Sequence, residues 1–178
     1  MKKIIIISLI LISNIIASEI KDKSETMIKQ FFKKDVDLSF EKFQINPILK
    51  KEIEMNCKQM FFRSEVYLWE IKSEYGIEAI AILDNVKGKN LPITFLVIFD
   101  LDGTIKYSTI VKYREEHGGA VKQNWWQKQF RGLNGNDEIS IGANIEAISG
   151  ATISSNSVTK GIKKVALLFN LIKMKYAD

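Results

Sequence analysis

The stretch ITFLVIFDLDGTIKYSTIV, residues 93–111, contains two runs that are typical of β-strands, Ile93–Phe99 and Thr104–Val111. Between them stands Asp102-Gly103, a pair that favours a tight hairpin turn because Gly accepts the positive φ that such turns need. Two further strand-like runs, each next to a turn signal, precede them: Val66–Ile71 and Ile77–Leu83, with turns at Tyr75-Gly76 and Lys87–Asn90. Consecutive strands joined by short turns pair antiparallel, so we expect an antiparallel meander.

Helix-type patterns flank these strands on both sides. Lys21–Lys34 is amphipathic, a second helix is expected from Asn46-Pro47 to about Arg63, and a C-terminal helix follows Thr152. Residues 115–147 are rich in loop formers, and the sequence has no Gly-x-Gly-x-x-Gly turn of the dinucleotide-binding kind. This layout predicts an α+β fold, in which an antiparallel β-sheet packs with N-terminal helices and a C-terminal helix.

The first 17 residues have the pattern of a signal peptide. Lys2-Lys3 precedes an apolar run over Ile4–Ile16, which is shorter than the roughly 20 residues that span a bilayer. We expect cleavage near Ala17, with a retained anchor as the alternative, and a single exported domain over residues 18–178 that does not span a membrane. Its location would be periplasmic or otherwise extracytoplasmic. A single Cys excludes a disulfide framework. The formal net charge is +5, and removal of Met1–Ala17 with its two Lys leaves +3, which is too mild to indicate nucleic-acid binding.

The segment Ser149-Gly-Ala-Thr-Ile-Ser-Ser155 stands just before the apolar pattern of the C-terminal helix. Unpaired backbone amides and the positive end of the helix dipole favour an anion at such a helix start, and Gly150 and Ala151 leave room for it. The same residues are compatible with a plain Ser or Thr helix cap. Local physics leaves both interpretations open.

The segment also resembles the flavinylation motif of the FMN-binding domain family, which includes the C subunit of the sodium-pumping NADH:quinone oxidoreductase, the Rnf complex G subunit and NosR-like N-terminal domains. The resemblance covers Val86–Lys164 through an ordered series of pieces: Gly88–Ile93, Asp102–Ile105, Glu116–Gly119, Trp125–Gly132 and Ser149–Thr152. Glu146, where an Asp is common, and His117-Gly118, in place of Thr-Pro, depart from the family pattern. In that family a flavin transferase outside the cytoplasm joins FMN to a Thr through a phosphoester, so the resemblance implies covalent FMN on Thr152.

The resemblance further implies a set of residues around the cofactor. The expected FMN-binding residues are Thr152, Ser149, Gly150, Ala151, Ile153, Ser154, Ser155, Glu116, His117, Gly118, Gly119, Trp125, Trp126 and Phe130. The Ser hydroxyls and the amides after Gly150 would position the phosphate, and the three aromatics would form either a wall for the flavin ring or ordinary core. Lys112, Lys122 and Arg131 are candidates to stabilise a reduced, anionic ring. We expect no catalytic residue and no metal ligand.

These features predict an exported flavoprotein that carries electrons, rather than a stand-alone enzyme. Its partners would be the flavin transferase, a quinol- or haem-linked membrane redox protein and an extracytoplasmic acceptor. Two alternatives stay open. Asp100-Leu-Asp-Gly-Thr104 resembles the first motif of haloacid-dehalogenase-type phosphatases, in which Asp100 would attack phosphorus and Asp102 would act as acid and base with magnesium. In a non-redox secreted binding module, Ser149–Ser155 would only cap a helix.

Overall fold

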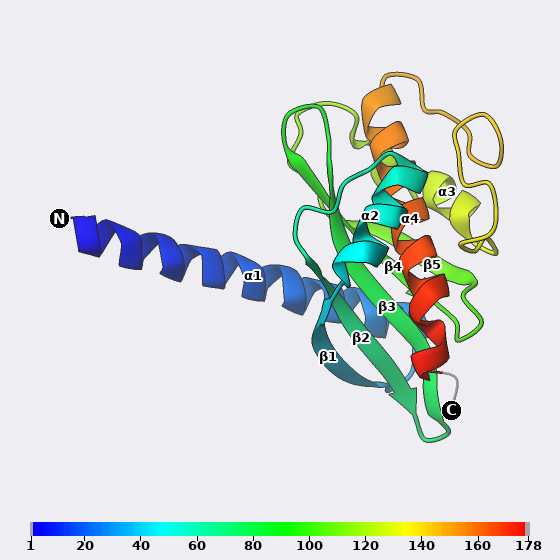
Figure 1. Ribbon diagram of the computed structural model, residues 1–178, viewed down its shortest axis with the longest axis horizontal. Helices are drawn as coiled ribbons and strands as arrows, with labels where there is room; N and C mark the ends of the chain where they lie inside the picture. Colours follow the sequence, from blue (N-terminus) through cyan, green and yellow to red (C-terminus); the bar gives the residue numbers. More distant parts are fainter. Residues whose placement is uncertain (1, 177–178) are drawn as a thin grey trace.

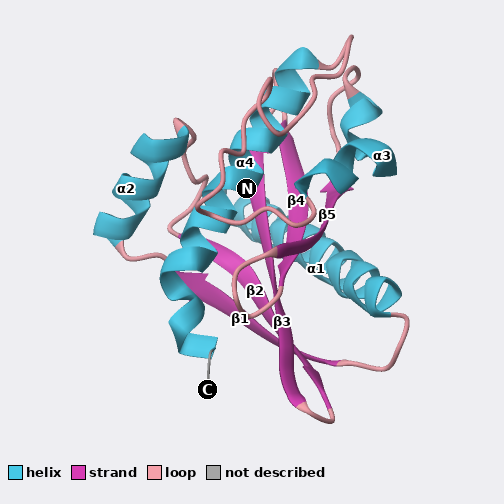
Figure 2. Ribbon diagram, turned by 90° about the vertical axis from the view of Figure 1, so that its right-hand side faces the viewer, coloured by secondary structure: helices cyan, strands magenta, loops and turns pink. Residues whose placement is uncertain are grey.

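The structure is a computed structural model that describes residues 2–176, with side chains from Ala17 onward. Within these residues the chain forms one five-stranded sheet with helices on both faces (Figures 1 and 2). The elements follow in the order α1 (Lys2–Phe32), β1 (Asp37–Gln44), α2 (Pro47–Cys57), β2 (Glu65–Ser73), β3 (Gly76–Lys87), β4 (Pro92–Phe99), β5 (Ile105–Lys112), η1 (Gly119–Lys122), α3 (Asn124–Gln127), η2 (Lys128–Phe130), α4 (Thr152–Ile172) and η3 (Lys173–Tyr176).

The strands lie in the order β1-β2-β3-β4-β5, and each pairs antiparallel with the next. The expected α+β class and antiparallel meander are therefore confirmed, and the Asp102-Gly103 turn joins β4 to β5. The edge strand β1 was not expected. Its sequence, DLSFEKFQ, alternates apolar side chains with charged or polar ones, because an edge strand buries less of its surface than a central strand does.

Both faces of the sheet are buried, since α2 and α4 cover one face and α1 covers the other (Figure 2). On the α4 side the core includes Ile82, Phe95 and Val97, and on the α1 side it includes Trp69, Leu83 and Leu96. This double burial explains why β3 and β4 read as nearly continuous apolar runs.

Helix α4 approaches the sheet closely at Gly161. A methyl group on this residue would overlap the side chain of Val86 and lie 3.0 Å from the ring of Phe95. The close approach sets the distance between α4 and strands β3 and β4, and it thereby fixes where the first turn of α4 lies above the end of the sheet.

The two N-terminal helices differ in length from the prediction. The helix expected over Lys21–Lys34 is the last part of α1, whose first part runs away from the sheet (Figure 1). Helix α2 starts as expected, with Asn46 Oδ1 accepting from Ile48 N at 2.9 Å, but it ends at Cys57 because Lys58 adopts a left-handed φ of 49°.

For most of the predicted signal peptide the structure describes the backbone alone. Met1 is not described, nor are the side chains of residues 2–16. Across the part of the chain that the structure does describe, no helix has an apolar stretch long enough to cross a membrane. Cleavage near Ala17 stays a prediction.

Candidate functional site

The start of α4 presents an exposed hydroxyl beside unpaired backbone amides. Thr152 is the first residue of the helix, its side chain is exposed, and no side chain in residues 17–176 caps the helix. The first helical hydrogen bond runs from Ser155 N to Ala151 O at 2.8 Å. The amides of Thr152, Ile153 and Ser154 therefore have no acceptor within the helix. Because α4 is 21 residues long, its dipole adds a partial positive charge at this point.

The residues before Thr152 leave space around it. Ser149 and Gly150 are exposed, and Gly150 has a φ of 75° with no described heavy atom within 4 Å of where a Cβ would be. Ala151 stands at the N-cap position, where its methyl group offers no hydrogen-bond acceptor. Ile153 is 52% exposed, so its side chain adds an apolar surface next to Thr152.

The hydroxyls of Ser154 and Ser155 turn away from the exposed face. Ser155 is fully buried and donates to Thr152 O at 3.1 Å. Ser154 is 5% exposed, and its Oγ lies 2.8 Å from the hydroxyl of Tyr113. If either hydroxyl donated to an anion at Thr152, it would have to give up this bond.

The Glu116–Gly119 loop lies against the first turn of α4. Tyr113, just after β5, donates from its hydroxyl to His117 O and also contacts Ser154 Oγ. Gly118 has a φ of 83°, and a Cβ there would lie 2.7 Å from Ser154 Oγ. The structure thus brings together two segments that were predicted to share one site, with the side chains of Glu116 and His117 exposed.

The three aromatic residues take different positions. Trp126 and Phe130 are fully buried in the core, with ring centroids 5.1 Å apart in an edge-to-face arrangement. Trp125 is 55% exposed. Of these three rings, Trp125 presents the surface on which a planar ligand could stack.

Trp126 also holds the backbone of the loop before Ser149, a role that was not predicted from the sequence. Its Nε1 donates to Glu146 O at 2.8 Å, while Glu146 N donates to Gln129 Oε1 at 2.8 Å. These two bonds hold the backbone of Glu146 from both sides, and its side chain stays exposed. The helix α3–η2 region therefore anchors the loop that leads into Ser149.

The β3–β4 turn lies at the same end of the molecule as the start of α4 (Figure 1). Glu115 Oε1 accepts from Asn90 N at 2.6 Å and from Leu91 N at 2.9 Å. These amides, first that of Leu91 and then that of Asn90, lower the pKa of the Glu115 carboxyl. Glu115 thereby ties the Gly88–Leu91 turn to the Glu116–Gly119 loop.

The three basic candidates are spread out. Lys112 Nζ forms an ion pair with Glu19 Oε1 of α1 at 3.3 Å, which places it on the face of the sheet opposite α4. Lys122 Nζ lies 5.8 Å from the ring centroid of Tyr113, beside the loop. Arg131 is exposed after η2. Lys122 is thus held beside the Glu116–Gly119 loop, whereas Lys112 is directed toward α1.

The two aspartates of the phosphatase alternative lie at the far end of α4. Lys173 Nζ, just past the helix, donates to Asp102 O at 2.6 Å. Asp100 and Asp102 both accept from Thr104 N, at 2.8 and 2.9 Å, as expected of a hairpin turn. Hydrogen bonding to Asp100 and then to Thr104 lowers the pKa of Asp102 to about 2. The phosphatase alternative was wrong, because it requires a parallel sheet and every pair of strands in residues 2–176 is antiparallel.

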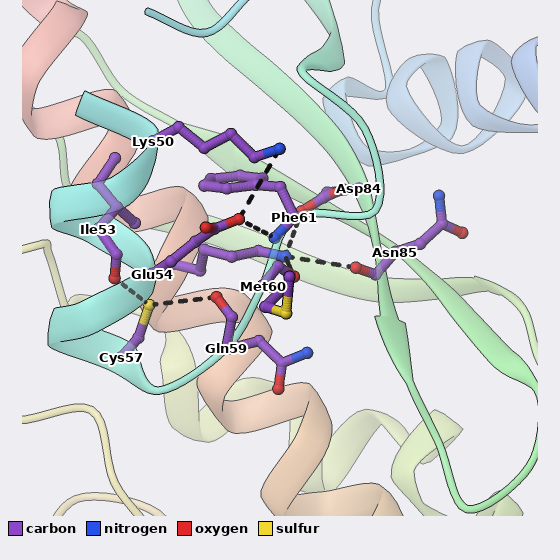
Figure 3. A network of polar contacts seen from close by, with 10 residues as sticks. Lys50, Ile53, Glu54, Cys57, Gln59, Met60, Phe61, Asp84 and Asn85 are labelled. Atoms are coloured by element: carbon purple, nitrogen blue, oxygen red, sulfur yellow. Dashed lines mark hydrogen bonds and ion pairs between the residues drawn. The ribbon is translucent and has the colours of Figure 1, made fainter. Parts of the chain in front are cut away.

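A buried ion pair joins α4 to β3, in the polar network of Figure 3. Lys164 Nζ lies 2.8 Å from Asp84 Oδ2, donates to Met60 O at 2.9 Å and lies 4.3 Å from the ring centroid of Phe61. Burial raises the pKa of the Asp84 carboxyl, and the Lys164 ammonium opposes that rise. Lys164 is about 18 Å along the helix from Thr152 at 1.5 Å per residue, so the pair belongs to the scaffold.

These observations define a class of protein: an antiparallel α+β domain whose long C-terminal helix offers an uncapped start beside an exposed Thr. Residues 88–166 match the model of the FMN-binding domain. This match confirms, for residues 88–166, the resemblance to the FMN-binding domain family seen in the sequence.

Two relatives illustrate the match. The G subunit of the Na(+)-translocating ferredoxin:NAD(+) oxidoreductase complex of Acetobacterium woodii is 39% identical over 70 residues, an alignment that covers 34% of each protein. The chain thus aligns with about a third of that relative. The crystal structure of Shewanella oneidensis NqrC superposes with a TM-score of 0.55 at 18% identity, covering 76% of this chain and 80% of that one. At this identity the second likeness concerns the fold.

The geometry at Thr152 fits the phosphate of FMN. Three amides without helical acceptors, an exposed hydroxyl and open space at Gly150 suit a phosphate ester, since a phosphate supplies the acceptor oxygens that the helix start lacks. The exposed side chain of Ile153, next to Thr152, offers apolar surface for a flavin.

Proposed function

We propose that the chain is an exported flavoprotein that carries FMN through a phosphoester to Thr152 and transfers electrons. The observation that supports this most directly is the uncapped start of α4 with Thr152 exposed at its first position. A helix in a folded protein normally has a Ser, Thr, Asp or Asn at the N-cap, and here Ala151 takes that place. A phosphate on Thr152 would complete the cap.

The residues at the site would hold the phosphate rather than carry out chemistry. Backbone amides of Thr152–Ser154 would donate to it, and the helix dipole would stabilise its negative charge. Ser149 is exposed and could add a hydroxyl donor. Bound FMN supplies one- and two-electron redox chemistry. A covalent tether keeps the local concentration of the cofactor high where free FMN is scarce.

The proposed partners follow from the relatives. One relative belongs to a Na(+)-translocating ferredoxin:NAD(+) oxidoreductase complex, so we infer a membrane redox protein as donor or acceptor of electrons, and a flavin transferase for maturation. The N-terminal pattern supports maturation and function outside the cytoplasm.

Intact-mass measurement tests the covalent bond. The full chain is produced with and without a flavin transferase, and the wild type is expected to gain the mass of FMN less one water only when the enzyme is present. Thr152→Ala should abolish the gain, because it removes the acceptor oxygen. Ser149→Ala, which removes a neighbouring exposed hydroxyl, should leave it intact.

Two results of the mass measurement would contradict the proposal. Loss of the gain in Ser149→Ala but not in Thr152→Ala would move the bond to another residue. A wild type that never gains mass would leave the helix start as a plain structural feature. The visible spectrum of the loaded protein should show flavin bands that dithionite bleaches reversibly.

A further inference from the structure

We propose that Tyr113 is the positioning residue of the FMN site: it holds the Glu116–Gly119 loop on the first turn of α4 and sets the direction of the Ser154 hydroxyl. The inference rests on the proposed function, since it concerns the surroundings of the phosphate on Thr152. It assigns a role to a residue outside the set expected from the sequence.

The hydrogen-bond donors and acceptors around Tyr113 permit one arrangement. His117 O is a carbonyl oxygen and can only accept, so the single proton of the Tyr113 hydroxyl goes to it. In the contact of 2.8 Å with Ser154, the Tyr113 oxygen must therefore accept, and Ser154 must donate. The proton of Ser154 is thus directed toward the loop and away from the exposed face of Thr152.

The ring of Tyr113 is also enclosed by the loop. A Cβ on Gly118 would lie 2.8 Å from the Tyr113 hydroxyl, and one on Gly119 would lie 3.8 Å from Cε1 of the ring. Lys122 covers the ring with its Nζ 5.8 Å from the centroid. The loop therefore wraps around one side chain, whose hydroxyl also reaches α4.

Two consequences follow for a bound cofactor. While Tyr113 holds Ser154, the donors to the phosphate are the backbone amides of the helix start, which cannot rotate away. His117 is kept at the side of α4 with an exposed ring, because its own carbonyl is fixed. Without the Tyr113 hydroxyl, Ser154 is free to turn toward the phosphate, and the loop that carries His117 loosens.

Tyr113→Phe tests this inference, with Tyr107→Phe as the matched control. Tyr107 is on β5, the strand that Tyr113 follows, but its ring stacks on Phe31 of α1 with centroids 4.9 Å apart, on the opposite face of the sheet. In the protein without flavin, amide hydrogen exchange in peptides spanning 113–124 and 152–158 is expected to be about fivefold faster for Tyr113→Phe, the factor for a hydrogen bond worth about 1 kcal/mol. Tyr107→Phe should leave these peptides unchanged.

In the protein loaded with FMN, the visible circular dichroism of the flavin and its midpoint potential are then measured. Both should shift in Tyr113→Phe but not in Tyr107→Phe. Unchanged exchange in Tyr113→Phe, or faster exchange with an unaltered flavin band and potential, would overturn the positioning role. A wild type that takes up no FMN counts against the proposed function, while the exchange comparison still decides whether Tyr113 holds the loop.

Discussion

Replacing Lys164 by Met should destabilise the fold strongly, because it leaves a buried carboxylate without its counter-ion. Lys164 is fully buried and Asp84 is 5% exposed, so water cannot compensate for the lost ammonium. The substitution keeps the apolar stem of the side chain but removes the donor to Met60 O as well as the partner of Asp84. The change therefore removes the charge and the hydrogen bonds of the Lys164 head group while it keeps the packing of the stem.

Breaking one side of a buried ion pair lowers the free energy of unfolding by about 3–5 kcal/mol. With a urea slope of about 2 kcal/mol/M, the midpoint of unfolding at pH 7 should fall by roughly 1.5–2.5 M. The deficit should shrink as the pH falls. Burial without Lys164 raises the folded-state pKa of Asp84 above its unfolded value, so the variant gains stability relative to the wild type as protons bind.

Two further variants make the result interpretable. Lys160→Met removes an exposed lysine one turn earlier on α4 and should change stability by less than about 0.5 kcal/mol. Adding Asp84→Asn to Lys164→Met removes the orphaned charge and should restore part of the loss. If Lys164→Met unfolds at the same urea concentration as Lys160→Met, the pair does not stabilise the scaffold and the reasoning fails.

Two other variants test how the loops are held. Gly118→Ala should lower the unfolding free energy by roughly 1–3 kcal/mol, through its φ of 83° and overlap with Ser154 and Tyr113. Gly142 has a φ of 90° with open space around it, so Gly142→Ala should lower the unfolding free energy only through the strained backbone. Equal losses in the two variants would argue against the close contact of Gly118 with Ser154 and Tyr113. Glu115→Gln should be less stable than the wild type at pH 7. That difference should shrink once the pH falls below the unfolded pKa of about 4.3, and it should be lost as the pH falls through the lowered folded-state pKa, since only the ionised form is stabilised. A pH-independent difference would contradict this reasoning.

Local patterns were enough to predict the meander and the position of the site. Each strand of the sheet's interior has an apolar run, and the turns at Gly76, Gly88 and Gly103 are marked by residues that suit them. The start of α4 was predictable from the change to helical spacing after Thr152. Strand β1 was not predicted, because a sequence with alternating charges at a sheet edge resembles a polar loop as closely as it resembles a strand.

Contacts between distant residues could not be predicted in the same way. Tyr113 and Ser154 are 41 residues apart, and nothing in either local pattern indicates that their hydroxyls meet. Lys164 would normally be assigned to the exposed face of its helix, because lysine is rarely buried. The sequence does contain one indication of a buried lysine, because Asp84 lies within a largely apolar strand and needs a buried partner. The burial of Trp126 and Phe130 has a comparable indication in the sequence, because the two rings are four residues apart and share one buried face.

The bond between FMN and Thr152 is tested most directly at the level of a single peptide. Trypsin should release Gly132–Lys160 from the flavin-transferase-treated protein as one fragment, since no Lys or Arg interrupts it. We expect this peptide to carry the mass of FMN less one water, and fragmentation to assign that mass to Thr152. Assignment to Ser149, Ser154 or Ser155, or an unmodified peptide from treated protein, would contradict the proposed attachment.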